Sequence, residues 1–134
     1  MSINKETDKL KNYYNPIGEI CLRKDRILTF EPNKNVTQTN INVLKSDLVT
    51  FIEWTKDSGP LPFLSDNRPL KQMSSEERLF IQAKVPLFAS KIAIIVSGGL
   101  SSFFYNIMAH LNKPEIPMKA FTDINKAFIW LKEN

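Results

Sequence analysis

The amino-acid sequence predicts an α/β domain whose mixed β-sheet begins with a hairpin, continues as strand–helix units, and carries helices on both faces. Three observations support this prediction. Alternating apolar residues at 18–23 and 27–31 flank a polar turn, which is typical of a hairpin. Strand-length and helix-length apolar patterns then follow each other along the rest of the chain. Residues 92–96 are all apolar, which a strand tolerates when both faces of its sheet are covered.

The first helix is expected between the hairpin and Gly59. Thr37 or Thr39 is suited to cap its start, while Gly59 and Pro60 end it. Its apolar positions recur at helical spacing and predict an inward stripe of Ile41, Leu44, Leu48, Phe51 and Ile52. A short strand at 61–64 and a loop at 67–73 follow.

The second half repeats the strand–helix pattern. Ser74 and Glu77 form a capping box that opens a helix. We expect its inner face to consist of Leu79, Phe80, Ala83 and Leu87. The apolar strand around 92–96, a glycine corner and an amphipathic helix come next. A strand at 118–121 then leads to a last helix, capped by Thr122 or Asp123.

Composition indicates one globular domain. The chain has 134 residues, of which 43% are hydrophobic and 24% charged. We expect residues 1–16 to be a flexible lead-in and 17–134 to be a single domain. The polar start contains no signal peptide pattern, no apolar stretch is long enough to span a membrane, and the single cysteine fits a reducing compartment, so we expect a cytoplasmic protein. The net charge of +4 is scattered, which argues against nucleic-acid binding.

A ligand site is expected at the carboxyl ends of the parallel strands, where open α/β sheets usually bind ligands. The corner Ser97-Gly98-Gly99 lets the backbone approach an anion, but it has neither dinucleotide-binding nor phosphate-loop spacing. A tight turn into a packed helix is the simpler interpretation. The candidate residues of this anion or ligand edge are Asp66, Arg68, Ser97, Gly98, Gly99 and Thr122.

The residue inventory does not favour catalysis. His110 is the only histidine and Cys21 the only cysteine, so a nucleophile has no obvious base and a metal has few ligands. Glu76 and Glu77 are explained as charges at a helix amino terminus. We therefore predict no catalytic residue, no metal and no cofactor.

Three apolar residues lie away from the predicted helix stripes and are candidates for an interface: Val43, Trp54 and Trp130. Exposed aromatic residues often anchor protein contacts. Packing of both helix faces within the domain explains them equally well. Self-association or binding of a protein partner through these residues is thus one of two open interpretations.

Several phrases in order resemble the SpoIIAA-like, or STAS (sulphate transporter and anti-sigma factor antagonist), superfamily, in particular its small uncharacterised bacterial members. The resemblance covers about residues 18–131. It is carried by Asp66-Asn67-Arg68, Ser74-Ser75-Glu76-Glu77-Arg78, Ala93-Ile94-Ile95-Val96-Ser97, Asn106, Lys113-Pro114, Pro117, Phe121 and Ala127-Phe128-Ile129-Trp130-Leu131.

This resemblance implies a non-enzymatic module that works through protein contacts and, in some relatives, is switched by phosphorylation at a helix start. Ser74 or Ser75 matches that acceptor, although it lies farther from the preceding strand than in phospho-switched members. The leading expectation is therefore a cytoplasmic bacterial interaction or regulatory module, possibly homodimeric. The alternative is a small-molecule or lipid-binding domain, with a pocket near residues such as Leu87, Phe103 and Phe104.

Overall fold

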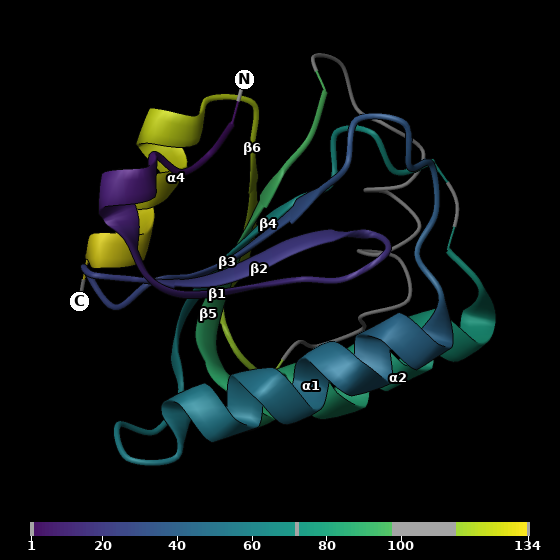
Figure 1. The fold of residues 1–134 in the computed structure, drawn as a ribbon, viewed down its shortest axis with the longest axis horizontal. Helices are drawn as coiled ribbons and strands as arrows, with labels where there is room; N and C mark the ends of the chain where they lie inside the picture. The colour runs from purple at the N-terminus through teal and green to yellow at the C-terminus, as the bar shows by residue number, and fades with distance from the viewer. Residues whose placement is uncertain (1, 72, 98–114, 134) are drawn as a thin grey trace.

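The structure is a computed structural model that describes residues 2–71, 73–97 and 115–133. Helices pack on a six-stranded sheet (Figure 1). The helix expected after residue 99, with His110, Phe103 and Phe104, lies outside the described residues. In chain order the described elements are η1 (Glu6–Asp8), β1 (Lys9–Tyr14), β2 (Gly18–Arg23), β3 (Leu28–Pro32), α1 (Ile41–Thr55), β4 (Leu61–Asp66), α2 (Ser75–Lys84), η2 (Val85–Leu87), β5 (Ala89–Ile95), β6 (Met118–Phe121) and α4 (Ile124–Lys132).

The strands lie in the sheet in the order in which they occur in the chain. β1, β2 and β3 pair antiparallel, whereas β3 to β6 pair parallel, which confirms the predicted mixed sheet. Right-handed crossovers that step in one direction place their helices on the same face. Accordingly, α1 and α2 cover one face and α4 covers the other (Figure 1). Helices on both faces are thus confirmed.

The amino terminus differs from the expected flexible lead-in over residues 1–16. Residues 9–14 form the edge strand β1, and Ile3 and Asn4 are buried. The turn into β2 explains the order of this strand. The Asn15 side-chain oxygen accepts hydrogen bonds from the amides of Ile17 and Gly18, a local pattern that fixes a turn. The apolar alternation in this segment is weak and lies among charged residues, so the sequence pattern did not predict the strand.

β5 separates two core clusters. Ile92 and Ile94 belong to the larger cluster beneath α1, and Ala93 and Ile95 to the cluster beneath α4. None of the four is more than 4% exposed. Full burial of an aliphatic side chain contributes roughly 1.5–3 kcal/mol, so this strand stabilises both layers. Burial on both faces is the physical reason for its unbroken apolar run.

The start of α1 corrects the predicted cap. Asn40, rather than Thr37 or Thr39, caps the helix by accepting a hydrogen bond from the Val43 amide. Asparagine is among the strongest amino-terminal caps. Thr39 is buried and binds the carboxylate of Glu77 in α2. The threonine therefore joins two helices and caps neither.

α2 presents a different face to the core from the one predicted. Leu79 and Leu87 are 66% and 54% exposed, and Ala83 is exposed as well. The buried contact between Glu77 and Thr39 fixes the rotation of the helix and turns Leu79 outward. Only Phe80 of the predicted inner set faces inward, where it is half-buried.

Candidate functional site

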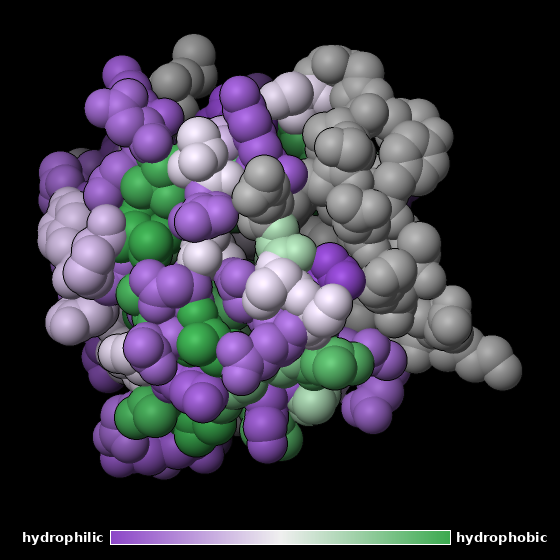
Figure 2. All heavy atoms as spheres, turned by 90° about the vertical axis from the view of Figure 1, so that its right-hand side faces the viewer, coloured by the Kyte–Doolittle hydropathy of each residue, from purple (hydrophilic) through white to green (hydrophobic). Residues whose placement is uncertain are grey.

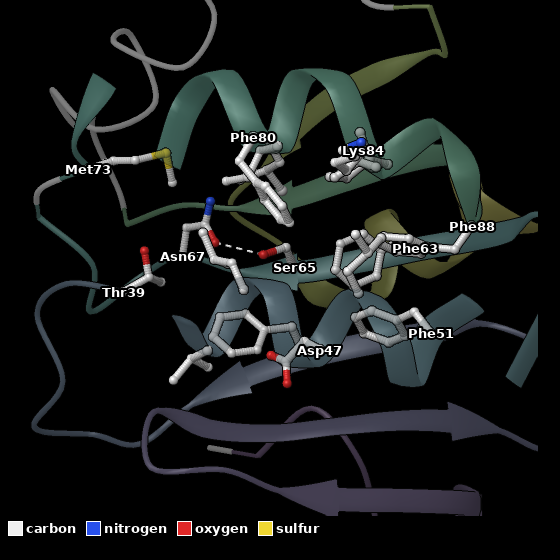
Figure 3. Close-up of a pocket in the computed structure, with 18 of the residues that line it drawn as sticks. Thr39, Asp47, Phe51, Phe63, Ser65, Asn67, Met73, Phe80, Lys84 and Phe88 are labelled. Atoms are coloured by element: carbon white, nitrogen blue, oxygen red, sulfur yellow. Dashed lines mark hydrogen bonds between the residues drawn. The ribbon is translucent and has the colours of Figure 1, made fainter. Parts of the chain in front are cut away.

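An apolar cavity of about 100 Å³ lies between α1, α2 and the sheet (Figure 3). The described residues that line it are mostly aliphatic or aromatic. Leu44 and Leu48 come from α1, Phe80 and Ile81 from α2, and strands β3 to β6 form the remaining wall. A cavity with such walls favours an apolar occupant, because water needs two to four polar partners.

Three phenylalanine rings form one end of this cavity. Phe51 stacks on Phe88 with ring centroids 4.6 Å apart. Phe63 meets Phe51 and Phe88 edge-on at 5.3 and 5.5 Å. Rings packed on each other in stacked and edge-to-face geometry hold their positions. The cluster therefore gives the cavity a firm aromatic wall.

A few polar groups border the cavity. The Ser65 hydroxyl donates to the Asn67 side-chain oxygen at 2.8 Å (Figure 3). Thr39 is engaged by Glu77. Lys84, on the exposed surface of α2, is the one cation among the described lining residues. Its ammonium is therefore the positive charge available to an anionic group at this part of the lining.

Asp47 is a buried carboxyl at the side of the cavity. It is 6% exposed, and both of its oxygens accept hydrogen bonds from the Asn15 side-chain nitrogen, at 2.8 and 3.0 Å. Burial raises the pKa of Asp47 to about 6, against the opposing effect of the hydrogen bond from Asn15. Figure 3 shows its carboxyl turned toward the β1–β2 hairpin. Asp47 therefore ties α1 to that hairpin.

The carboxyl edge of the sheet brings several predicted ligand residues together. Arg68 forms a bidentate ion pair with the buried Asp66, with Nε–Oδ1 and Nη2–Oδ2 distances of 2.8 and 2.7 Å. The Ser97 hydroxyl donates to the Arg68 carbonyl at 3.3 Å, and Thr122 is exposed after β6. Gly98 and Gly99, which were also predicted to belong to this edge, lie outside the described residues. Asp66 therefore neutralises the charge of Arg68 within the described part of this edge.

The candidate phospho-acceptors open α2. Ser74 accepts a hydrogen bond from the Glu77 amide at 3.1 Å, and Glu77 accepts from the Ser74 amide, which confirms the capping box. The Ser75 hydroxyl accepts from Arg78 at 2.9 Å. Both serines are exposed. The adjacent Glu76 and Glu77 carboxylates oppose added negative charge at either position.

The three interface candidates pack within the domain. Val43 and Trp54 are half-buried against the larger core cluster. Trp130 packs against the smaller cluster, with its ring 5.7 Å from that of Phe121 and the Lys91 ammonium 4.6 Å from its centroid. These contacts agree with the intradomain interpretation of all three residues.

Cys21 and the acidic side chains are the described groups to consider as a nucleophile or as metal ligands. Cys21 is buried, and burial raises the pKa of its thiol to about 11, so it is a poor nucleophile. Histidine, cysteine and acidic side chains do not gather into a metal-binding group in the described ranges. Among the described helices, none has both the length and the apolar character needed to cross a bilayer.

One face of the surface is shown in Figure 2. Apolar side chains of the described residues appear there in small groups separated by polar ones. Single exposed apolar residues are ordinary for a folded domain. The cavity is therefore the more distinctive feature of the described molecule.

A mixed sheet with an apolar cavity beneath two crossover helices defines an α/β domain with an internal cavity. The chain belongs to the family described as Domain of unknown function (DUF7793), whose model matches residues 20–134. No curated protein and no solved structure matches the chain.

The sequence predicted a pocket near Leu87, Phe103 and Phe104 as an alternative, but it did not predict the described lining of the cavity, which does not include Leu87, or the residues that organise it. Asp47 lies four positions before Phe51 on the inward side of α1, so a polar residue on a predicted core stripe was the available signal. Its partner Asn15 is 32 residues away. The contact between Thr39 and Glu77 spans 38 residues and left no local pattern.

Proposed function

We propose that this protein is a non-enzymatic, STAS-like module that binds a small apolar molecule between α1, α2 and the sheet. The single observation that carries the proposal is the apolar cavity with its wall of Phe51, Phe63 and Phe88. Ligand sites are usually concave and mostly apolar, with a few polar groups that orient the ligand. The STAS-like assignment is supported by the consecutive parallel strands β3 to β6 and by the crossover helices α1 and α2 on one face.

The size of the cavity narrows the ligand class. A cavity of 150 Å³ in an engineered protein holds benzene, so about 100 Å³ accommodates a tail of roughly four carbons. A long acyl chain does not fit in that volume. The apolar walls favour the tail, and Lys84, the one cation among the described lining residues, favours an anionic head. The ligand class we propose is a short-chain carboxylate.

Calorimetric titration of pentanoate into the protein tests this proposal. We expect a dissociation constant on the order of 1 mM, since small ligands gain little free energy in total. Leu48→Trp fills the cavity and should abolish binding, whereas Val49→Trp should leave it unchanged. Val49 is the neighbouring position on the same helix and is 68% exposed. Equal pentanoate binding by both variants would contradict the proposal.

The role of Lys84 is tested by comparing pentanoate with 1-pentanol. Lys84→Gln should weaken pentanoate binding about twofold to fivefold, the modest contribution of an exposed charge. Binding of 1-pentanol, which carries the same tail without the charge, should not change. Equal effects on both ligands would mean that Lys84 does not recognise the head group.

A protein-interaction module is the second candidate function. Leu10, Tyr13 and Tyr14 expose 47%, 48% and 63% of their surface on the edge strand β1. Large exposed side chains on a sheet edge favour contact with another protein. This candidate function requires no ligand in the cavity, so a failure of pentanoate to bind would not contradict it.

A further inference from the structure

β1 forms one edge of the sheet and pairs only with β2 among the described strands. Its six residues make it the longer of the two edge strands, because β6 at the opposite edge has four. An exposed edge presents unpaired amides and carbonyls that accept a further strand. The strands between these two edges, β2 to β5, are paired on both sides.

The pairing pattern identifies which backbone groups of β1 face outward. Hydrogen-bonded and non-hydrogen-bonded pairs alternate along an antiparallel ladder. The Asn15 amide donates to the Gly18 carbonyl, so in this register Tyr13 and Lys11 also occupy hydrogen-bonded positions toward β2. The amides and carbonyls of Asn12 and Tyr14 consequently point away from β2, toward solvent.

Lysines usually protect an edge strand from pairing, but one of the two on β1 is already engaged. The Lys9 side chain is 9% exposed and forms ion pairs with Glu6 and Glu19 at 2.9 Å. Lys11 is exposed and lies within electrostatic range of Glu53 on α1. Lys11 is therefore the lysine that limits the register of an added strand, and the irregularity between Lys9 and Lys11 confines regular pairing to residues 11–14.

We propose that β1 pairs antiparallel with β1 of a second copy of this chain, with the two-fold axis between the two Asn12 residues. The outward amide and carbonyl of each Asn12 then exchange hydrogen bonds, and the two six-stranded sheets become continuous. Lys11 lies opposite Tyr13 of the second copy, a cation–aromatic pair across the strands. This inference does not depend on the cavity.

Charge selects this register over its neighbour. A shift of the partner strand by two residues in one direction places Lys11 opposite Lys11, and directly opposed like charges destabilise a sheet. The Asn12-centred register avoids that repulsion and brings Tyr14 to the same end of the new ladder as Leu10 of the second copy, which lies at the irregularity between Lys9 and Lys11. Both of those side chains are largely exposed in one chain. A second copy is therefore the occupant that fits this edge.

Proline at position 12 gives a test that acts on the backbone. Asn12→Pro removes an amide that faces solvent and leaves the β1–β2 ladder intact, because edge strands tolerate proline at such positions. Asn12→Ala is the matched control: both variants lose the side-chain hydrogen bond to Glu19, but alanine keeps the amide. By light scattering, we expect a twofold loss of mass for Asn12→Pro and dimers for the parent and Asn12→Ala.

Three outcomes would overturn the proposal: a monomeric parent across the concentration series, a dimeric Asn12→Pro, or the loss of dimers in Asn12→Ala as well. Circular dichroism establishes whether Asn12→Pro is folded. If it does not fold, hydrogen exchange of the parent decides. The Asn12 and Tyr14 amides should be protected at high concentration and exchange faster after dilution. Equal exchange at both concentrations would contradict strand pairing.

Discussion

At the scale of single residues, Asp47 is a carboxyl in an environment unlike that of a typical surface carboxylate. It is buried beside the apolar cavity, and its hydrogen-bond donor, Asn15, is neutral. A buried carboxyl without a cationic partner favours the protonated form, which explains its raised pKa. Asp25 behaves in the opposite way, because the neighbouring Arg23 lowers the pKa of its carboxyl despite partial burial.

The raised pKa of Asp47 predicts that the protein loses stability as pH rises from about 4 to about 6. In that window the folded state retains a proton that the unfolded state, with a pKa of 3.8, has released. The free energy of unfolding should fall by about 3 kcal/mol and then level off. Urea denaturation between pH 4 and 7 measures this fall, and Asp47→Asn should flatten it.

Asp25 does not obscure this measurement. Its lowered pKa adds stability that is present above about pH 4 and is lost only at lower pH. The two carboxyls therefore act in different pH ranges. An identical slope in the parent and in Asp47→Asn between pH 4 and 6 would assign the effect to another group.

Replacing glycine by alanine should lower the free energy of unfolding by different amounts at Gly18 and at Gly59. A Cβ on Gly18 would lie 2.2 Å from the backbone carbonyl oxygen of Glu31, so Gly18→Ala must displace β3 and should cost about 3 kcal/mol. Gly59 has a φ of +79° and open space around it, so Gly59→Ala should cost only about 1 kcal/mol. Denaturant midpoints of the two variants provide the comparison. Equal midpoints would be inconsistent with the close approach at Gly18.

At the scale of elements, the start of α2 links stability to the rotation of the helix. The capping box of Ser74 and Glu77 satisfies two amides, and the same Glu77 binds Thr39 ahead of α1. The capping pattern is local and was read from sequence. The rotation that it helps to fix depends on Thr39, which is distant in the chain, so the inner face of α2 could not be predicted.

Ser74→Ala should lower the free energy of unfolding by about 1 kcal/mol, because the Glu77 amide loses its acceptor. Ser75→Ala serves as the control. Ser75 is exposed and only accepts a hydrogen bond from Arg78, so its loss should cost no more than about 0.5 kcal/mol. Thermal unfolding of both variants checks this order. A larger loss for Ser75→Ala would contradict the capping role of Ser74.

At the scale of the whole molecule, the sheet and the helix layers could be predicted from the sequence, but the cavity between them could not. The hairpin of β2 and β3, the doubly buried β5 and the presence of helices on both faces follow from patterns within about ten neighbouring residues. The cavity depends on how α1 and α2 are rotated and on the contacts of Asp47 and Thr39 across more than 30 residues. Such contacts leave no periodic signal in one sequence.

The carboxyl edge illustrates the same limit. Asp66 and Arg68 were both predicted to follow a strand, and their residue types fitted a ligand site; Asp66 is instead the last residue of β4, and Arg68 lies beyond it. The sequence did not reveal that they would pair with each other at 2.7 Å. Once paired, they hold the loop after β4 in position beside the cavity wall, where Asn67 lies.

The central claim, an apolar tail bound within the cavity, is tested most directly by nuclear Overhauser effects between bound pentanoate and the protein. Figure 3 shows Phe51, Phe63 and Phe88 together at one end of the cavity. We predict effects from the terminal methyl group of pentanoate to these three rings, and their loss in Leu48→Trp. Effects confined to exposed side chains such as Val49, or none at saturating pentanoate, would contradict the claim.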